Sequence, residues 1–215
     1  MRTDIKFCGL TRAIDARQAA MCGARYAGVI FAEGPRRLEP AAADEVLDGA
    51  GGALLRVGVF GAADAEAIHA AVRGAHLDIV QLHGDPSARE VRQVRERSGA
   101  RVWAVLRISG AAPEERLAEL DGEADAVVFD TRVATKLGGT GRTFDWGAAA
   151  RGARPSLSAL VVAGGLTPEN VGAAVRTLAP AVVDVSSGVE ERPGVKDHAR
   201  MAAFAEAVRA AGGAT

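Results

Sequence analysis

Polar and reactive residues follow several apolar, strand-like runs in this chain of 215 residues. In a parallel α/β barrel, the active site is built from residues at the carboxyl ends of the strands. Repeated placement of such residues at the ends of apolar runs therefore predicts a barrel with an active site at one end. The segments that follow this pattern are Lys6–Thr11, Val80–Gly84, Phe129–Thr131, Ala163–Pro168 and Asp184–Glu190.

A thiol and a carboxyl group are the candidates for proton transfer. Cys8 ends the first run, and Lys6 lies two residues earlier on the same side of the strand, where its charge would lower the thiol pKa. Asp130 ends the sixth run, where a partly dry mouth would raise the pKa of its carboxyl group enough for it to donate a proton. Such a pair, facing each other across a barrel, suits acid–base isomerisation better than acyl transfer. The alternatives are a small buried apolar role for Cys8 and a loop hydrogen bond with Thr131 for Asp130.

Glycine and serine clusters follow the seventh and eighth runs, where barrels bind phosphate. Unhindered backbone N–H groups, serine hydroxyls and a helix N-terminus can hold an anion without a net positive chain. The two clusters together predict a phosphate site. They are Gly164 with Gly165, and Ser186 with Ser187 and Gly188.

Two arginines and a histidine lie in other loops of the same end. Arg36 and Arg37 follow the second run, and a guanidinium group can hold a substrate carboxylate through two parallel hydrogen bonds. His83 ends the fourth run, and we expect it to orient a neighbour rather than to transfer a proton. The other histidines lack metal-binding spacing, so we expect no metal site. The stretch Gly138–Gly141 lacks the Walker and Rossmann patterns and is interpreted as a mouth loop.

Net charge, apolar stretches and cysteine positions argue against several classes of protein. The net charge is −1 without a basic block, which argues against nucleic acid and anionic membranes as partners. No apolar stretch reaches the roughly eighteen residues of a membrane span, and no signal peptide precedes the first strand. Cys8 and Cys22 belong to different elements, so we expect no disulfide and a cytoplasmic location. We expect a monomer or a weak homodimer that binds a phosphorylated small molecule.

Eight apolar runs alternate with eight helical stretches. The runs are nearly continuous in their apolar character, as strands buried on both faces are. Strict alternation in a chain of this length predicts an α/β fold with a single eight-stranded parallel barrel, a TIM barrel, over residues 1–215. The expected strands are Ile5–Cys8, Tyr26–Phe31, Leu54–Phe60, Leu77–Leu82, Val102–Leu106, Ala126–Phe129, Leu157–Ala163 and Ala181–Val185. The expected helices are Thr11–Cys22, Ala41–Asp48, Ala63–Arg73, Pro86–Ser98, Pro113–Leu120, Asp145–Arg151, Pro168–Leu178 and Asp197–Ala211.

Proline and glycine residues predict where some of the helices begin and end. Thr167 before Pro168, and Asp85 before Pro86, predict helix starts, because proline suits the first helical position. Gly99 predicts a left-handed helix stop.

The motifs taken together resemble a known family. Six motifs in the family's order, spread from residue 6 to about residue 197, are similar to those of phosphoribosylanthranilate isomerase of tryptophan biosynthesis. The run Asp184–Glu190 is the most specific of them. The others are Lys6–Thr11, Val57–Phe60, Val80–Gly84, Gly138–Gly141 with Phe144–Trp146, and Ala163–Leu166 with Pro168–Val171; Pro193–Asp197 follows the most specific run.

The resemblance implies a reaction and a set of roles. The reaction is the Amadori rearrangement of N-(5-phosphoribosyl)anthranilate to 1-(2-carboxyphenylamino)-1-deoxyribulose 5-phosphate, without metal or organic cofactor. Cys8 would be the general base and Asp130 the general acid. The anthranilate carboxylate would be held by Arg36 or by Arg37, because the loop before them is one residue shorter than the family's usual Ser-Pro-Arg loop. The strand-seven and strand-eight loops would hold the phosphate, with Lys6, His83 and Asp184 in supporting positions.

Two other functions fit parts of the pattern. A histidine-pathway isomerase is also a phosphate-binding barrel, but it uses two aspartates, and Cys8 stands where the first acid would be. A catalytically inactive barrel that binds a phosphorylated ligand is the other alternative, and the presence of both Cys8 and Asp130 argues against it.

Overall fold

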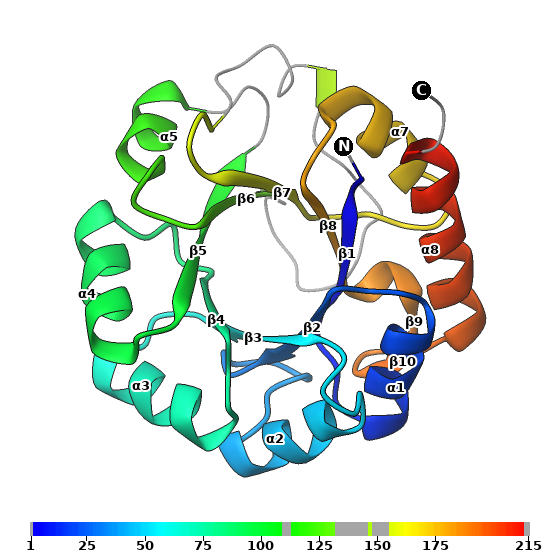
Figure 1. Ribbon diagram of the computed structural model, residues 1–215, viewed down its shortest axis with the longest axis horizontal. Coiled ribbons are helices and arrows are strands. Elements are labelled where there is room, and N and C mark those ends of the chain that lie inside the picture. The colour runs from blue at the N-terminus through cyan, green and yellow to red at the C-terminus, as the bar shows by residue number, and fades with distance from the viewer. Residues whose placement is uncertain (1, 109–112, 132–145, 148–154, 213–215) are drawn as a thin grey trace.

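The strands close into a barrel. The computed structural model describes residues 2–108, 113–131, 146–147 and 155–212. Within them, eight parallel strands pair in chain order and β1 pairs with β8 to complete the ring, as the sequence predicted (Figure 1). The strands are β1 Asp4–Phe7, β2 Tyr26–Ile30, β3 Leu55–Phe60, β4 Ile79–Leu82, β5 Arg101–Ile108, β6 Ala126–Thr131, β7 Ala159–Val162 and β8 Val182–Val185.

Helices surround the barrel (Figure 1). Each described helix lies between consecutive strands or follows the last one, which is the alternation predicted from the sequence. Most of the helix expected over Asp145–Arg151, and the loop Gly138–Gly141, lie outside the described residues. The described helices are α1 Ala13–Met21, α2 Pro40–Asp48, α3 Ala65–Gly74, α4 Ala88–Ser98, α5 Glu114–Leu120, α7 Val171–Leu178 and α8 His198–Gly212.

The strands are apolar along their whole length because both of their faces are buried. One cluster of side chains fills the barrel interior, with Trp103 and Val105 of β5 and Tyr26 of β2 among them. Residues that alternate with these, such as Ala104 and Leu106, belong to the larger cluster between strands and helices. Since side chains alternate in direction along a strand, two apolar layers produce the continuous runs seen in the sequence.

The described helices begin one to three residues from the predicted starts, and the two starts predicted at Pro168 and Pro86 are both too early. Helix α7 begins at Val171 rather than Pro168, because the Asn170 side chain accepts a hydrogen bond from the Thr167 N–H (2.8 Å) and donates one to the Gly165 carbonyl, which holds the preceding residues in a turn. Helix α4 begins at Ala88, after a capping box built by Ser87 and Glu90. The left-handed stop at Gly99 is confirmed, with φ of 71°.

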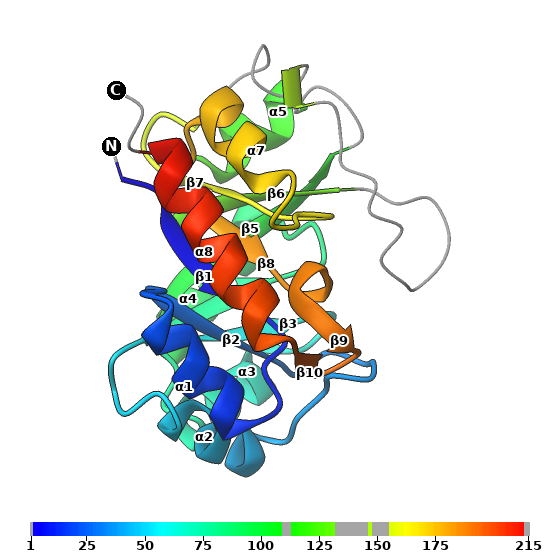
Figure 2. The same cartoon turned by 90° about the vertical axis from the view of Figure 1, so that its right-hand side faces the viewer.

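A short hairpin follows β8 and was not predicted. The 3-10 turn η1 (Ser187–Val189) leads into β9 (Glu190–Arg192), which pairs with β10 (Val195–Lys196) before α8 begins (Figure 2). Gly194, with φ of 81°, lies in the turn between the two strands. Two charged residues of the hairpin, Glu190 and Lys196, have buried side chains and lie next to the loop expected to bind phosphate.

Asp15 of α1 fastens this hairpin to the barrel. Its carboxylate is fully buried and accepts hydrogen bonds from Arg12 (2.8 and 2.7 Å), from the His198 ring (2.8 Å) and from the Lys196 backbone N–H (3.3 Å). Burial alone would raise the pKa of Asp15, but these hydrogen bonds outweigh it and lower that pKa below its usual value.

We predict that Asp15→Asn lowers the free energy of unfolding by about 2 kcal/mol or more at pH 7. A lowered folded-state pKa means that the carboxylate stabilises the fold above the unfolded pKa of about 3.9, and that this stabilisation is lost as the pH falls through the folded pKa. The difference between parent and variant should therefore shrink in acid. Urea unfolding at several pH values measures it. Asp48→Asn, at an exposed ion pair with Arg56, is the control and should cost less than about 1 kcal/mol. Equal stabilities of the parent and Asp15→Asn at pH 7 would contradict the prediction.

Candidate active site

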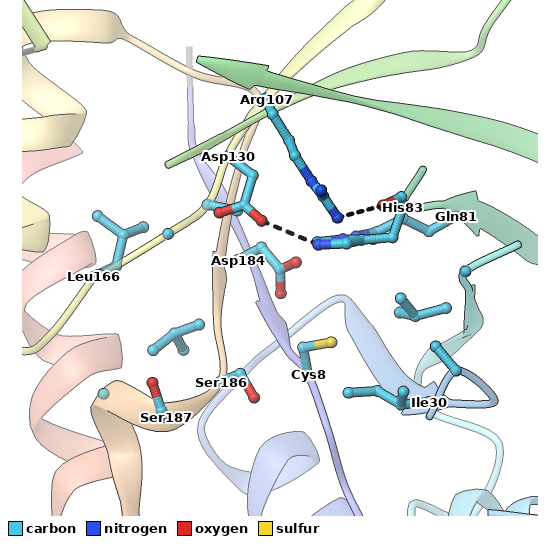
Figure 3. A pocket seen from close by; sticks show the side chains of 18 of the residues that line it. Cys8, Ile30, Gln81, His83, Arg107, Asp130, Leu166, Asp184, Ser186 and Ser187 are labelled. Carbon is cyan, nitrogen blue, oxygen red and sulfur yellow. Dashed lines mark hydrogen bonds and ion pairs between the residues drawn. The ribbon is translucent and has the colours of Figure 1, made fainter. Parts of the chain in front are cut away.

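A cavity of about 490 Å³ opens at the carboxyl ends of the strands. Figure 3 shows side chains from several strands pointing into it. Of the predicted site residues, Lys6, Arg36 and Arg37 do not form part of its wall. Those that do are Cys8, His83, Asp130, Gly164, Gly165, Asp184, Ser186, Ser187 and Gly188.

Cys8 follows the end of β1 directly. Its backbone N–H donates to the Val185 carbonyl (2.9 Å), which places the thiol in the cavity with only 7% of the residue exposed. Gly28 of the neighbouring strand leaves room for it, since a Cβ there would come within 3.1 Å of the Cys8 sulfur. Burial raises the pKa of the thiol more than the nearby Lys6 ammonium lowers it. The expected influence of Lys6 is therefore present, but the thiol pKa in this structure is raised and not lowered.

Lys6 and Asp184 form a buried ion pair beside Cys8. They are register partners on β1 and β8, and Lys6 Nζ donates to Asp184 Oδ2 at 2.8 Å. Lys6 is fully buried and Asp184 is 6% exposed. Burial alone would lower the pKa of Lys6, but Asp184 and Cys8 together raise it, so Lys6 stays charged. An ammonium group held in this way is a fixed positive charge for a thiolate at Cys8.

Asp130 and His83 meet on the opposite side of the cavity. His83 Nε2 lies 3.4 Å from Asp130 Oδ2, and Figure 3 shows the two side chains directed toward each other. Burial lowers the pKa of His83, Arg107 lowers it further and Asp130 opposes this change. The lowered pKa favours a neutral imidazole beside Asp130, a form suited to orienting the carboxyl group; that role of His83 stays a prediction.

The two glycine and serine loops meet at another part of the wall. Gly164 and Gly165 have φ of 82° and 64°, a conformation that turns the chain sharply after β7. Gly188 packs so closely that a Cβ there would lie 1.9 Å from the Leu166 carbonyl oxygen. Within the described part of the chain, the N–H groups of Gly164, Gly165, Ser187 and Gly188 donate no hydrogen bond. Unpaired N–H groups gathered in this way are able to bind an anion.

The two arginines of the β2 loop have different surroundings. The Arg36 side chain packs against Gly9, which directly follows Cys8, and its guanidinium group pairs with the buried Glu190. Arg37 is more exposed and pairs with Glu33 and Glu39 in its own loop. Of the two, Arg36 is therefore the arginine that lies close to Cys8.

Sequence reasoning did not single out Gln81. It lines the cavity, is 3% exposed, and its Oε1 atom has no partner among the described residues; Asp184 Oδ1 is in the same situation. A signal was present, because Gln81 lies on β4 two residues before His83, which follows the end of that strand, and residues two apart in extended chain point to the same side. Buried polar atoms of this kind are suited to hydroxyl groups of a ligand.

Two features are absent from the described residues. No helix there is both long and apolar enough to cross a membrane. No group of three or more His, Cys, Asp or Glu side chains in that part of the chain is arranged to hold a metal ion.

Comparisons with known proteins agree with one another. Residues 5–207 match the family model described as N-(5'phosphoribosyl)anthranilate (PRA) isomerase. The N-(5'-phosphoribosyl)anthranilate isomerase of Rhodospirillum rubrum is 42% identical, over 96% of this chain and 98% of the relative. A crystal structure of phosphoribosyl anthranilate isomerase from Thermotoga maritima superimposes with a TM-score of 0.86 at 32% identity, covering 97% of this chain and 99% of that one. Another, of the isomerase in complex with reduced 1-(o-carboxyphenylamino)-1-deoxyribulose 5-phosphate, gives 0.80 at 30% identity, with coverage of 97% and 99%.

Proposed function

The chain belongs to the N-(5'-phosphoribosyl)anthranilate isomerase family, and we propose that it catalyses the family's Amadori rearrangement in tryptophan biosynthesis with Cys8 as general base and Asp130 as general acid. The observation that carries this assignment is the shared cavity. A thiol, a carboxyl group and a two-loop anion site line one space of about 490 Å³. A ligand with a phosphate at one end of a sugar can therefore reach both proton-transfer groups at once.

In the first step, Asp130 donates a proton to the ribose ring oxygen. The bond from that oxygen to the first sugar carbon breaks, and the amine nitrogen supplies electrons to form a protonated Schiff base. His83, 3.4 Å from the carboxyl group, holds Asp130 in place. A neutral His83 leaves the acidic proton on Asp130 rather than competing to donate one.

In the second step, the Cys8 thiolate removes the proton from the second sugar carbon. The electrons of the broken C–H bond move toward the Schiff-base nitrogen and give an enolamine, which relaxes to the ketone product. Because burial raises the thiol pKa, the thiolate needs the fixed charge of Lys6, which Asp184 holds beside Cys8. Lys6 thus supports the base through its charge without contacting the substrate.

Other residues bind the two ends of the substrate and its sugar. The N–H groups of the β7 and β8 loops bind the phosphate, with Ser186 and Ser187 nearby, and Arg36 binds the anthranilate carboxylate. Gln81 and Asp184 Oδ1 bind sugar hydroxyls.

A phosphorylated small molecule is the ligand, as in the related complex. We propose that the enzyme is cytoplasmic, uses no metal or organic cofactor, and is a monomer or a weak homodimer.

The direct test is turnover. Purified chain is added to freshly made N-(5-phosphoribosyl)anthranilate, and loss of the substrate's fluorescence is followed against a blank that contains no enzyme. We expect a rate proportional to enzyme concentration and the open-chain ketone as product. A rate equal to the blank would refute the proposal and favour a binding role. Turnover of a two-phosphate substrate of the histidine pathway instead would favour the other isomerase.

A further inference from the structure

Arg36 does not lie free at the mouth but is held by a buried carboxylate. Its Nε donates to Glu190 Oε1 at 2.8 Å and its Nη2 to Glu190 Oε2 at 2.5 Å. The Glu190 side chain is 4% exposed, whereas the Arg36 side chain is 21% exposed. Two parallel hydrogen bonds from a planar group fix the plane and direction of the guanidinium as well as its position.

We propose that Glu190 and Lys196 form a positioning pair that orients Arg36 for the carboxylate of the substrate; this inference rests on the proposed function. A guanidinium group offers two forks of N–H donors, one at the side and one at the end. Glu190 occupies the side fork, built from Nε and Nη2. Within the described residues, Nη1 donates no hydrogen bond, which leaves the end fork to receive a second carboxylate.

Lys196 determines the net charge of the group that it forms with Arg36 and Glu190. An arginine paired with one glutamate alone would be neutralised and would attract a second carboxylate weakly. Lys196 Nζ donates to Glu190 Oε1 at 2.8 Å, so two cations share one anion and the group keeps a net positive charge. Burial lowers the pKa of Lys196, and Glu190 opposes that change by favouring the ammonium form. Lys196 is itself fully buried, a placement that a merely solvated lysine does not adopt.

Lys196 also connects the two ends of the site. Its Nζ donates to the Ser186 carbonyl at 3.1 Å, in the loop proposed to bind phosphate. Two residues at the start of α1 hold the Lys196 backbone: its N–H donates to the Asp15 carboxylate, and its carbonyl accepts a hydrogen bond from Arg12. The carboxylate-binding arginine and the phosphate-binding loop are therefore fastened to the same rigid lysine. The separation of the two recognition groups therefore depends on this lysine.

The test is a double-mutant cycle on Glu190 and Arg36. Glu190→Gln should raise KM for N-(5-phosphoribosyl)anthranilate about tenfold or more and change kcat by less than about threefold, because carboxylate binding and not proton transfer is impaired. In an Arg36→Ala background, the same change should alter kcat/KM by less than about twofold, since the residue that it acts through is gone. Inhibition by inorganic phosphate should be unchanged. Glu191→Gln, an exposed neighbour on the same strand, is the matched control and should behave as the parent.

Several outcomes would overturn the inference. A parental KM in Glu190→Gln, or an effect of the same size with and without Arg36, would mean that Glu190 does not act through that arginine. Should Glu190→Gln fail to fold by circular dichroism, Glu190→Asp takes its place in the cycle, because it keeps the charge but cannot reach both nitrogens. A parent enzyme without turnover would instead refute the proposed function, so the two failures are distinct.

Discussion

Replacing Cys8 by alanine, or Asp130 by asparagine, should each lower kcat by about 10²–10⁴-fold, the usual contribution of one general acid or base. Each substitution removes the atom that carries the proton and leaves the phosphate loops and Arg36 in place. KM should therefore change little. Steady-state kinetics on purified variants, with folding checked by circular dichroism, measures both constants.

Cys22 is the matched control for the base. It is also a buried free thiol whose pKa is raised by burial, but it lies at the end of α1, where it accepts a hydrogen bond from Gln18 and neighbours Arg209. Cys22→Ala should keep kcat within about threefold of the parent, since no proton transfer passes through it. Near-parental turnover in a correctly folded Cys8→Ala variant would show that the proposed mechanism is wrong.

The barrel could be predicted because its causes are local and repeated. Each strand is a short run that is apolar on both faces, and some helix ends lie at residues with known preferences, as α4 does at Gly99. The placement of Cys8, His83 and Asp130 in one cavity follows from the same rule, because parallel strands end on the same side. Errors of a few residues arose where a side chain redirected the backbone, as Asn170 does before α7.

The partners of charged groups were beyond sequence reasoning. Arg36 and Glu190 are 154 positions apart, and Lys6 and Asp184 are 178 apart. Such pairs depend on how the ring closes and on the unpredicted hairpin after β8, neither of which leaves a local pattern. The same holds for the Cys8 pKa. Lys6 two residues away argued for a lowered value, but the burial that raises it is a property of the whole cavity.

Gly188→Ala should raise KM about 100-fold, through the loss of two or more hydrogen bonds to a charged phosphate. The added Cβ would lie 1.9 Å from the Leu166 carbonyl oxygen and 3.0 Å from its carbonyl carbon. These are backbone atoms and cannot rotate away, so the β8 loop must move off the β7 loop. The two sets of N–H groups that together form the anion site would then no longer converge. Turnover at saturating substrate should fall less than KM rises, because Cys8 follows β1 and Asp130 lies on β6, away from the displaced loop.

Inorganic phosphate separates this effect from general damage. As a competitive inhibitor it contacts the anion site alone, so its inhibition constant should rise in Gly188→Ala. Gly84→Ala is the control at the same end of the barrel, because a Cβ at Gly84 meets nothing within 4 Å. That variant should be inhibited like the parent. Parental inhibition of a folded Gly188→Ala variant would mean that phosphate binds elsewhere, and Arg36 would then be the first place to look for it, since it is the cation of the β2 loop that lies close to Cys8.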